Sequence, residues 1–454
     1  MADDTMNKIY RNIEKKRVSY PKIINEVSGI SSVDEHPGSK LPMSKALKWA
    51  ESNLKHLGAF VTVADLGYAE FDGKRKRITP VVYAALRADV GKPTLCVYAH
   101  LDTKKDKKDL FGKGVVDSKG PLLCWFLAIQ CYKSVGAELP VNVRFLIENA
   151  KDYEEDELLK YLRTSKELLF HGVKFICLSD SPVLEGKKPL ITYGFRGRCG
   201  FEVTVEGGKG SVDCGQYSGA VQEVMTDMVA LMSSLVTTKG EVLLNLSQDV
   251  AAVTPEEEKA CHASCFSVTD YRQKTGANVL LHKENKKSLL MHRNRFSSLS
   301  IHSIDSGDLI NSIPMKVTAK CTITTVPHQR RNDVKNTVIN HLTKKFKDLK
   351  SNNKLNIEIT SVDKYWLGDY NDKNYTAIYK AVHKVMKEEP EFVRKGSCYS
   401  AIAELQEIVE PMSVALLPVG YADATGSLCA QTDMRTFMDG VKIIVAYLDL
   451  LSKA

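Results

Sequence analysis

Three side chains that bind metals or transfer protons lie close together between residues 100 and 117. The segment LCVYAHLD ends an apolar run with His100 and Asp102, and Asp117 follows in a glycine-flanked stretch. In open α/β sheets, side chains that do chemistry lie at the carboxyl ends of strands, where the loops diverge. This pattern is typical of a bound cation. Alternatively, His100 and Asp102 hydrogen-bond each other and cap the next helix.

Two later apolar runs also end in acidic residues. VNVRFLIE, residues 141–148, leads into an acidic loop over 148–156, and VKFICLSD ends at Asp180. The intervening stretches 119–136 and 156–169 have helical patterns, so the chain reads strand, helix, strand, helix, strand. The carboxyl ends of such strands converge on one crevice, which favours a metal or catalytic site over independent helix caps.

Length and composition indicate a globular protein of about two domains. The chain has 454 residues, 43% of them hydrophobic and 26% charged. The net charge of +8 comes from 63 basic and 55 acidic residues that are mixed along the chain. No basic stripe with interleaved aromatic residues and no recognisable nucleic-acid module is present, so we expect no nucleic-acid partner.

The sequence also predicts no membrane partner and a cytoplasmic location. It shows no charged-then-apolar leader and no apolar run long enough to span a bilayer. Its eleven cysteines are scattered without C-x-x-C pairs. This spacing indicates reduced, packed thiols and not a disulfide framework.

The order of the expected elements predicts the fold class and the domains. Residues 1–195 and 367–454 are expected to form one α/β domain, with a mixed, largely parallel sheet flanked by helices. Residues 196–366 follow a β-α-β-β-α-β order, which predicts an inserted, ferredoxin-like α+β domain. A split domain is continuous in space, so the last segment is expected to return to the crevice.

Several motifs resemble one family over nearly the whole chain. They are H-x-D, D-x-K-G-P, VRFLIE, CLSD, ITYGFRGRCGFEVTVEG, AVQEVMTDMVALMSSLV, GANVLLH, LLMHRNRFSSLSIH, SIPMKV and ALLPVGYAD. The sequence resembles the cytosolic non-specific dipeptidase and carnosine dipeptidase family, which are co-catalytic zinc peptidases of the aminoacylase and carboxypeptidase G type. The resemblance implies a zinc-binding catalytic domain, an inserted lid domain that mediates a homodimer, and a small peptide-like ligand.

The resemblance implies one complete metal site, for zinc or manganese. His100 and Asp180 match its ligands, and Asp117 matches the aspartate that bridges two ions in the family. Asp102 matches the carboxylate that orients the imidazole.

The second metal site of the resembled family is incomplete in this chain. It would depend on Asp152, whose side chain is shorter than the family's glutamate, and residues 421–433 contain no histidine. Cys429 is either an ordinary loop cysteine or a soft ligand in place of that histidine.

The resemblance also implies that the residues performing the chemistry are replaced. Lys151 stands in place of the general-base glutamate, and an ammonium group neither accepts a proton from water nor tolerates an adjacent cation. Asp213 stands in place of the lid histidine that stabilises the oxyanion, and Thr324 in place of an arginine that binds the substrate carboxylate.

A few further residues are weaker candidates for substrate binding. Gly396 and Cys398 match the family's glycine-serine loop, and Arg293 lies near a lid face that contacts substrate in the family. His292 and His302 are expected to hydrogen-bond within the lid and not to bind metal.

These replacements favour a catalytically impaired or inactive dipeptidase-like protein with a binding, regulatory or structural role. The alternative is a residual or repurposed metal-dependent hydrolase acting on a small peptide or amide. It would use a single metal at His100, Asp117 and Asp180, or Lys151 as a nucleophile or electrostatic clamp. With no metal bound, Lys151 would supply the missing positive charge.

Overall fold

The structure is a computed structural model that describes residues 2–30, 44–71, 73–101, 118–150, 154–185, 188–246, 250–264, 266–307, 311–422 and 434–454. The chain divides into two compact units. Unit 1 comprises Met1–Tyr193, Gly368–Val393 and Glu404–Ala454, and unit 2 comprises Gly194–Leu367 and Arg394–Ala403.

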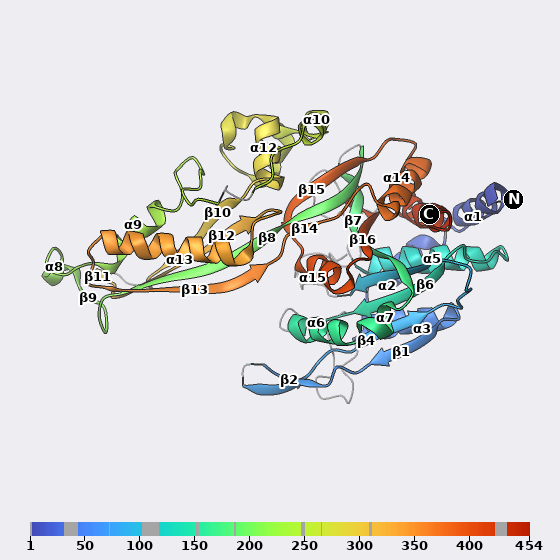
Figure 1. Cartoon of the computed structure of the whole chain (residues 1–454), viewed down its shortest axis with the longest axis horizontal. Helices are drawn as coiled ribbons and strands as arrows, with labels where there is room; N and C mark the ends of the chain where they lie inside the picture. The colour runs from blue at the N-terminus through green and yellow to red at the C-terminus, as the bar shows by residue number, and fades with distance from the viewer. Residues whose placement is uncertain are drawn as a thin grey trace. The chain divides into compact units, whose positions relative to one another are not determined.

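Unit 1 contains a mixed, mostly parallel sheet of the predicted kind (Figure 1). Its strands, in sheet order, are β1 (Phe60–Ala64), β4 (Val81–Ala85), β6 (Asn142–Glu148), β5 (Thr94–His100), β7 (Val173–Glu185) and β16 (Ser413–Ala422). The strands β6, β5, β7 and β16 pair in parallel, whereas β4 pairs antiparallel to β6 and to β1. The predicted α/β fold class is confirmed.

Helices flank this sheet, and the most buried of them is α5. The helices of this part of the chain are α1 (Ala2–Lys15), α2 (Tyr20–Ser28), α3 (Lys45–His56), α5 (Lys119–Ser134), α6 (Glu155–Thr164), α7 (Lys166–Phe170), α14 (Lys373–Met386), α15 (Ser400–Val409) and α16 (Met434–Leu451). Helix α5 is apolar on nearly every side because it packs between the sheet and α16. The ring of Trp125 makes edge contacts with Phe145 on β6 and Tyr447 on α16, each at 6.4 Å.

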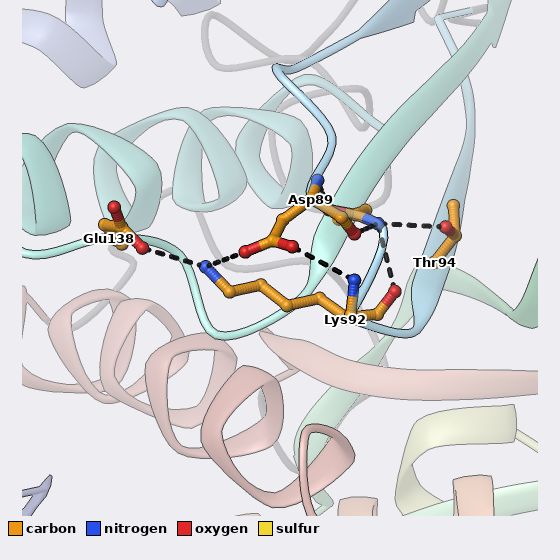
Figure 2. Close-up of polar contacts among 6 residues, drawn as sticks. Asp89, Lys92, Thr94 and Glu138 are labelled. Atoms are coloured by element: carbon orange, nitrogen blue, oxygen red, sulfur yellow. Dashed lines mark hydrogen bonds and ion pairs between the residues drawn. The ribbon is translucent and has the colours of Figure 1, made fainter.

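A buried asparagine fixes the start of β5 beside β6. The Nδ2 group of Asn142 donates to the carbonyl oxygens of Asp89 at 2.9 Å and Lys92 at 3.0 Å, and its Oδ1 accepts from the Asp89 amide at 2.8 Å. Figure 2 shows this turn, in which Lys92 also pairs with Glu138 at 3.0 Å. Because the turn sets where both strands begin, it also sets which residues stand side by side at their carboxyl ends.

Unit 2 is built on an antiparallel sheet with helices on one face. The sheet order is β13 (Lys354–Asp363), β8 (Lys188–Glu206), β12 (Lys316–Thr325) and β10 (Ser298–Asp305), and β8 enters unit 2 at Gly194. Helices α9 (Val224–Ser233) and α13 (Arg331–Asp348) cover one face, and α13 runs along the strands in Figure 1. The chain order β8-α9-β10-β12-α13-β13 is the predicted β-α-β-β-α-β pattern.

Shorter elements complete the described residues. They are β2 (Tyr68–Phe71), β3 (Lys74–Arg77), β9 (Val212–Asp213), α8 (Cys214–Tyr217), α10 (Pro255–Ala263), α11 (Val268–Thr275), η2 (His282–Glu284), α12 (Lys286–Asn294), β11 (Ser312–Ile313), β14 (Trp366–Leu367) and β15 (Glu391–Cys398). No helix among the described residues is both long and apolar enough to cross a bilayer.

Candidate functional site

Two of the predicted strand-end residues lie side by side at one edge of the unit 1 sheet. His100 ends β5 and pairs in register with Glu148, which ends β6. On the other side, Tyr98 of β5 pairs with Leu178 of β7. This pairing ends at Tyr98 and Leu178, and Asp180 follows two residues later within β7, which continues to Glu185 because its last residues pair with β8 and β16. The structure therefore brings together the predicted strand ends at His100 and Glu148, whereas the predicted end of a strand at Asp180 is wrong.

Glu148 fixes the backbone that leads out of this edge. Its Oε2 accepts from the amide of Ala150 at 2.6 Å, and its Oε1 accepts from the hydroxyl of Tyr98 at 3.4 Å. Burial, with the carboxylate of Glu148 nearby, raises the pKa of Tyr98 well above its ordinary value, so the phenol stays a neutral donor. The sequence pattern placed Glu148 in an acidic loop but did not predict this positioning role.

A second buried carboxylate fixes the chain beyond residues 151–153. Glu154 is fully buried, and its Oε2 accepts from the hydroxyl of Thr79 at 2.9 Å. Together with Glu148, it anchors the described residues on both sides of Lys151 and Asp152. These two candidates themselves lie outside the described residues.

Helix α5 contacts β7 just before Asp180. The indole Nε1 of Trp125 donates to Ser179 Oγ at 2.8 Å, one residue before Asp180. At the start of the same helix, Lys119 Nζ donates to the carbonyl oxygen of Ile30 at 2.6 Å.

Several predicted site residues cannot be placed. Asp102, Asp117, Lys151, Asp152, Cys429 and the side chain of Asp180 lie outside the described residues. Within the described residues, no three His, Cys, Asp or Glu side chains gather in an arrangement that would hold a metal ion. The metal site made of His100, Asp117 and Asp180 therefore stays a prediction.

In unit 2, Asp213 is an exposed helix cap. It precedes α8, and its Oδ1 accepts from the backbone amide of Gln216 at 3.0 Å. Thr324 is also engaged locally, because its Oγ1 accepts from the amide of Ser298 at 2.9 Å.

The two lid histidines make different contacts. The ring of His302 hydrogen-bonds Thr322 Oγ1 at 2.7 Å, which confirms the predicted lid contact for this residue. The ring of His292 stacks on that of His282 with centroids 3.6 Å apart.

Arg196 holds the segment predicted to be a glycine-serine loop. In the structure Gly396 and Cys398 lie on strand β15 (Glu391–Cys398). Its Nε donates to the carbonyl oxygen of Gly396 at 2.9 Å. Its Nη1 donates to the carbonyl oxygens of Phe296 at 3.1 Å and His292 at 3.3 Å, at and beyond the end of α12. Burial lowers the pKa of the Arg196 guanidinium, and these carbonyls satisfy its donors. The sequence did not single out Arg196, because its partners lie far away along the chain.

The predicted substrate contacts of Arg293 and Cys398 are not tested, but their surroundings are defined. The Arg293 guanidinium lies 5.1 Å from the centroid of the Tyr271 ring and 6.0 Å from that of Phe266. Cys398 is partly buried, and burial raises the pKa of its thiol.

Comparison with known proteins shows full-length relatives. Residues 193–350 match the model of a peptidase dimerisation domain. The chain is 31% identical to the Cys-Gly metallodipeptidase dug1 of Schizosaccharomyces pombe, over 99% of this chain and 98% of that protein. It is also 31% identical to the Beta-Ala-His dipeptidase of Homo sapiens, over 97% and 92% of the two chains.

Solved structures agree with these relatives. The crystal structure of human carnosine dipeptidase 1 matches with a TM-score of 0.82 and 28% identity, covering 99% of each chain. The structure of the di-peptidase Dug1p from Saccharomyces cerevisiae matches with the same TM-score, identity and coverage. From its fold, its strand-end residues and these full-length relatives, the chain belongs to the M20 dipeptidase family.

Proposed function

We propose that this protein is a catalytically impaired or inactive dipeptidase-like protein that has kept the family scaffold for a binding, regulatory or structural role. The observation that carries the proposal is the state of Asp213. It stands where the resemblance implies the oxyanion-binding histidine, and its carboxylate is an exposed cap on the amide of Gln216 at 3.0 Å. A carboxylate in this position opposes negative charge developing on a substrate oxygen.

The sequence around the predicted metal ligands supports the same proposal. Lys151 replaces the general base, and residues 421–433 lack the histidine expected for a second ion. Loss of a general base costs about 10²- to 10⁴-fold in rate, and loss of an oxyanion donor about 10²- to 10³-fold. Even if these losses overlap, little dipeptidase turnover would remain.

Retained features of unit 2 support binding. Arg196 holds strand β15 at Gly396, close to Cys398, so a surface for a small peptide-like ligand would be pre-formed. The match of residues 193–350 to a peptidase dimerisation domain supports a homodimer formed through this unit.

The test compares turnover and binding in the same protein. The purified protein, loaded with zinc or manganese, is assayed with Cys-Gly and β-Ala-His, beside the double variant Lys151→Glu/Asp213→His and human Beta-Ala-His dipeptidase as a positive control. We expect turnover at least about 10⁴-fold below the control, with a rise in the double variant. Calorimetry should still detect dipeptide binding. Turnover comparable to the control would overturn the proposal.

A second candidate is a residual hydrolase with one metal ion. The parallel pairing of β5 with β7 supports it, because the last paired residues, Tyr98 and Leu178, lie two positions before His100 and Asp180. Together with Asp117, these residues offer the imidazole and carboxylate ligands that zinc and manganese bind. The ion would act as a Lewis acid towards a peptide or amide carbonyl. Asp102 would orient the imidazole of His100.

Metal analysis decides between the two candidates. Under the second, elemental analysis after zinc loading finds one ion per chain, and His100→Ala loses both this ion and any amide hydrolysis. An absence of bound zinc rules out the one-metal version. The version that relies on Lys151 fails if Lys151→Ala leaves every detected activity unchanged.

A further inference from the structure

The hairpin of β2 and β3 forms a separate two-stranded sheet in unit 1. The register pairs Tyr68 with Arg77, Glu70 with Arg75 and Phe71 with Lys74. Strand β3 consists entirely of basic residues, in the sequence Lys-Arg-Lys-Arg. Such a strand lacks the apolar side chains that would explain it as part of a core.

The aromatic ring of Tyr68 lies close to both arginines of β3. The guanidinium carbon of Arg75 lies 4.8 Å from the centroid of the Tyr68 ring, and that of Arg77 lies 5.2 Å from it. Arg77 also donates to the carboxylate of Asp65. A guanidinium held flat against a ring loses less side-chain freedom when it binds a second carboxylate, so the cations are pre-organised.

Two of the four cations are available for a partner. Lys74 and Arg75 are exposed, and neither forms an ion pair with a carboxylate among the described residues. Residues 65–77 contain three acidic side chains, Asp65, Glu70 and Asp72, but none of them lies on β3 itself. The side chains of β3 are therefore all cationic, and the one acidic residue paired with them in register is Glu70 of β2, opposite Arg75.

The backbone of β3 also has an edge that can accept another strand. The amide of Ile78 donates to Gly67 at 3.0 Å, which identifies a hydrogen-bonded pair at the base of the hairpin. In an antiparallel ladder such pairs alternate along the strand, so the backbone groups of Arg75 and Arg77 point away from β2. Strand β3 has no partner other than β2 among the described strands.

We propose that the β3 edge is a docking surface for an acidic peptide segment, which adds to the hairpin as a third strand. Backbone hydrogen bonds to Arg75 and Arg77 would supply affinity, and carboxylates facing the β3 cations would supply specificity. A nucleic acid is the weaker alternative, because its affinity requires more phosphate contacts than four neighbouring cations provide.

The test uses the full chain and a labelled peptide of about eight residues that alternates threonine with glutamate, long enough to span β3. The matched probe carries glutamine in place of glutamate, and a labelled thymidine oligonucleotide represents nucleic acid. We expect fluorescence anisotropy to report binding of the glutamate peptide alone. Hydrogen exchange at the amides of Arg75 and Arg77 should slow when that peptide is present.

Variants at exposed cations test whether peptide binding depends on the β3 edge or only on the net charge of the protein. Arg75→Gln should weaken peptide binding about fivefold, and Arg75→Lys by less, because the charge remains. Lys344→Gln on α13 removes the same charge from another exposed position and should have no effect. Equal binding of both peptides, binding of the oligonucleotide instead, or no binding at all would overturn the proposal. In the last case, the cations would serve only to prevent edge-to-edge pairing.

Discussion

The carbonyl oxygen of Arg293 leaves no room for a side chain at Gly396. A Cβ atom built on Gly396 would lie 2.1 Å from this oxygen, a distance at which the backbone must move. Arg196 donates both to the carbonyl oxygen of Gly396 on β15 and to that of His292 on α12, so it links the strand to the helix at this contact.

Gly396→Ala is therefore expected to lower the free energy of unfolding by about 1–3 kcal/mol, because the new methyl group forces β15 and α12 apart. Urea denaturation followed by circular dichroism measures this change. Gly91→Ala is the matched control, since its Cβ would meet only Asp89 at an ordinary 3.6 Å. Equal stability of the two variants would contradict the close contact.

Arg196→Lys is expected to weaken the attachment of β15 at Gly396. A lysine ammonium cannot span the separate carbonyl oxygens that the guanidinium fork contacts, at 2.9 Å and 3.1 Å. Leaving one buried acceptor unsatisfied costs about 1–3 kcal/mol of unfolding free energy. Hydrogen exchange within Glu391–Cys398 should become faster.

The control for this substitution is Arg163→Lys. Arg163 is half-exposed and pairs with Glu404 at 2.7 Å, so its replacement should change stability by less than about 0.5 kcal/mol. If Arg196→Lys lowers the free energy of unfolding no more than Arg163→Lys does, Arg196 does not hold β15 in place.

Thr79→Val tests the hydrogen bond between Thr79 and Glu154, which holds the chain just after residues 151–153. Valine has the shape of threonine but cannot donate to the buried carboxylate of Glu154, now bonded at 2.9 Å. We expect the free energy of unfolding to fall by about 1–3 kcal/mol. Thr79→Ser keeps the hydroxyl and should recover part of this loss. A valine variant as stable as the wild-type protein would show that the bond contributes nothing.

The fold could be predicted because it follows from patterns within short segments of the sequence. Apolar runs ending at His100 and Asp180 mark parallel strands, and parallel strands bring their carboxyl ends to one edge whatever the loops do. The β-α-β-β-α-β order of unit 2 likewise follows from the succession of short periodic segments.

The positioning contacts could not be predicted in this way. Thr79 and Glu154 are 75 residues apart, and Arg196 and Gly396 are 200 apart. No local periodicity relates such pairs, since tertiary packing alone brings them together. Glu148 was visible as an acid at a strand end, but its bond to Tyr98 depends on the register between two strands.

The stacked imidazoles of His282 and His292 should make the stability of unit 2 depend on pH. Burial lowers the pKa of His292 below its usual value, and the neighbouring His282 lowers it further. A histidine whose folded pKa is depressed stabilises the fold above the unfolded pKa, about 6.5, and this contribution is lost as the pH falls through the folded pKa. The rings are 3.6 Å apart, so a proton on His292 places positive charge directly against the ring of His282.

We therefore expect hydrogen exchange within Lys286–Asn294 to accelerate between pH 7.5 and pH 5, beyond the intrinsic pH dependence of exchange. His282→Phe keeps an aromatic ring on His292 but removes the second titratable group, so it should reduce this acceleration. His302→Phe is the matched control, because His302 is exposed and contacts Thr322 on the neighbouring strand β12. An acceleration that is the same in wild type and in His282→Phe would mean that the stacked pair does not set the pH response.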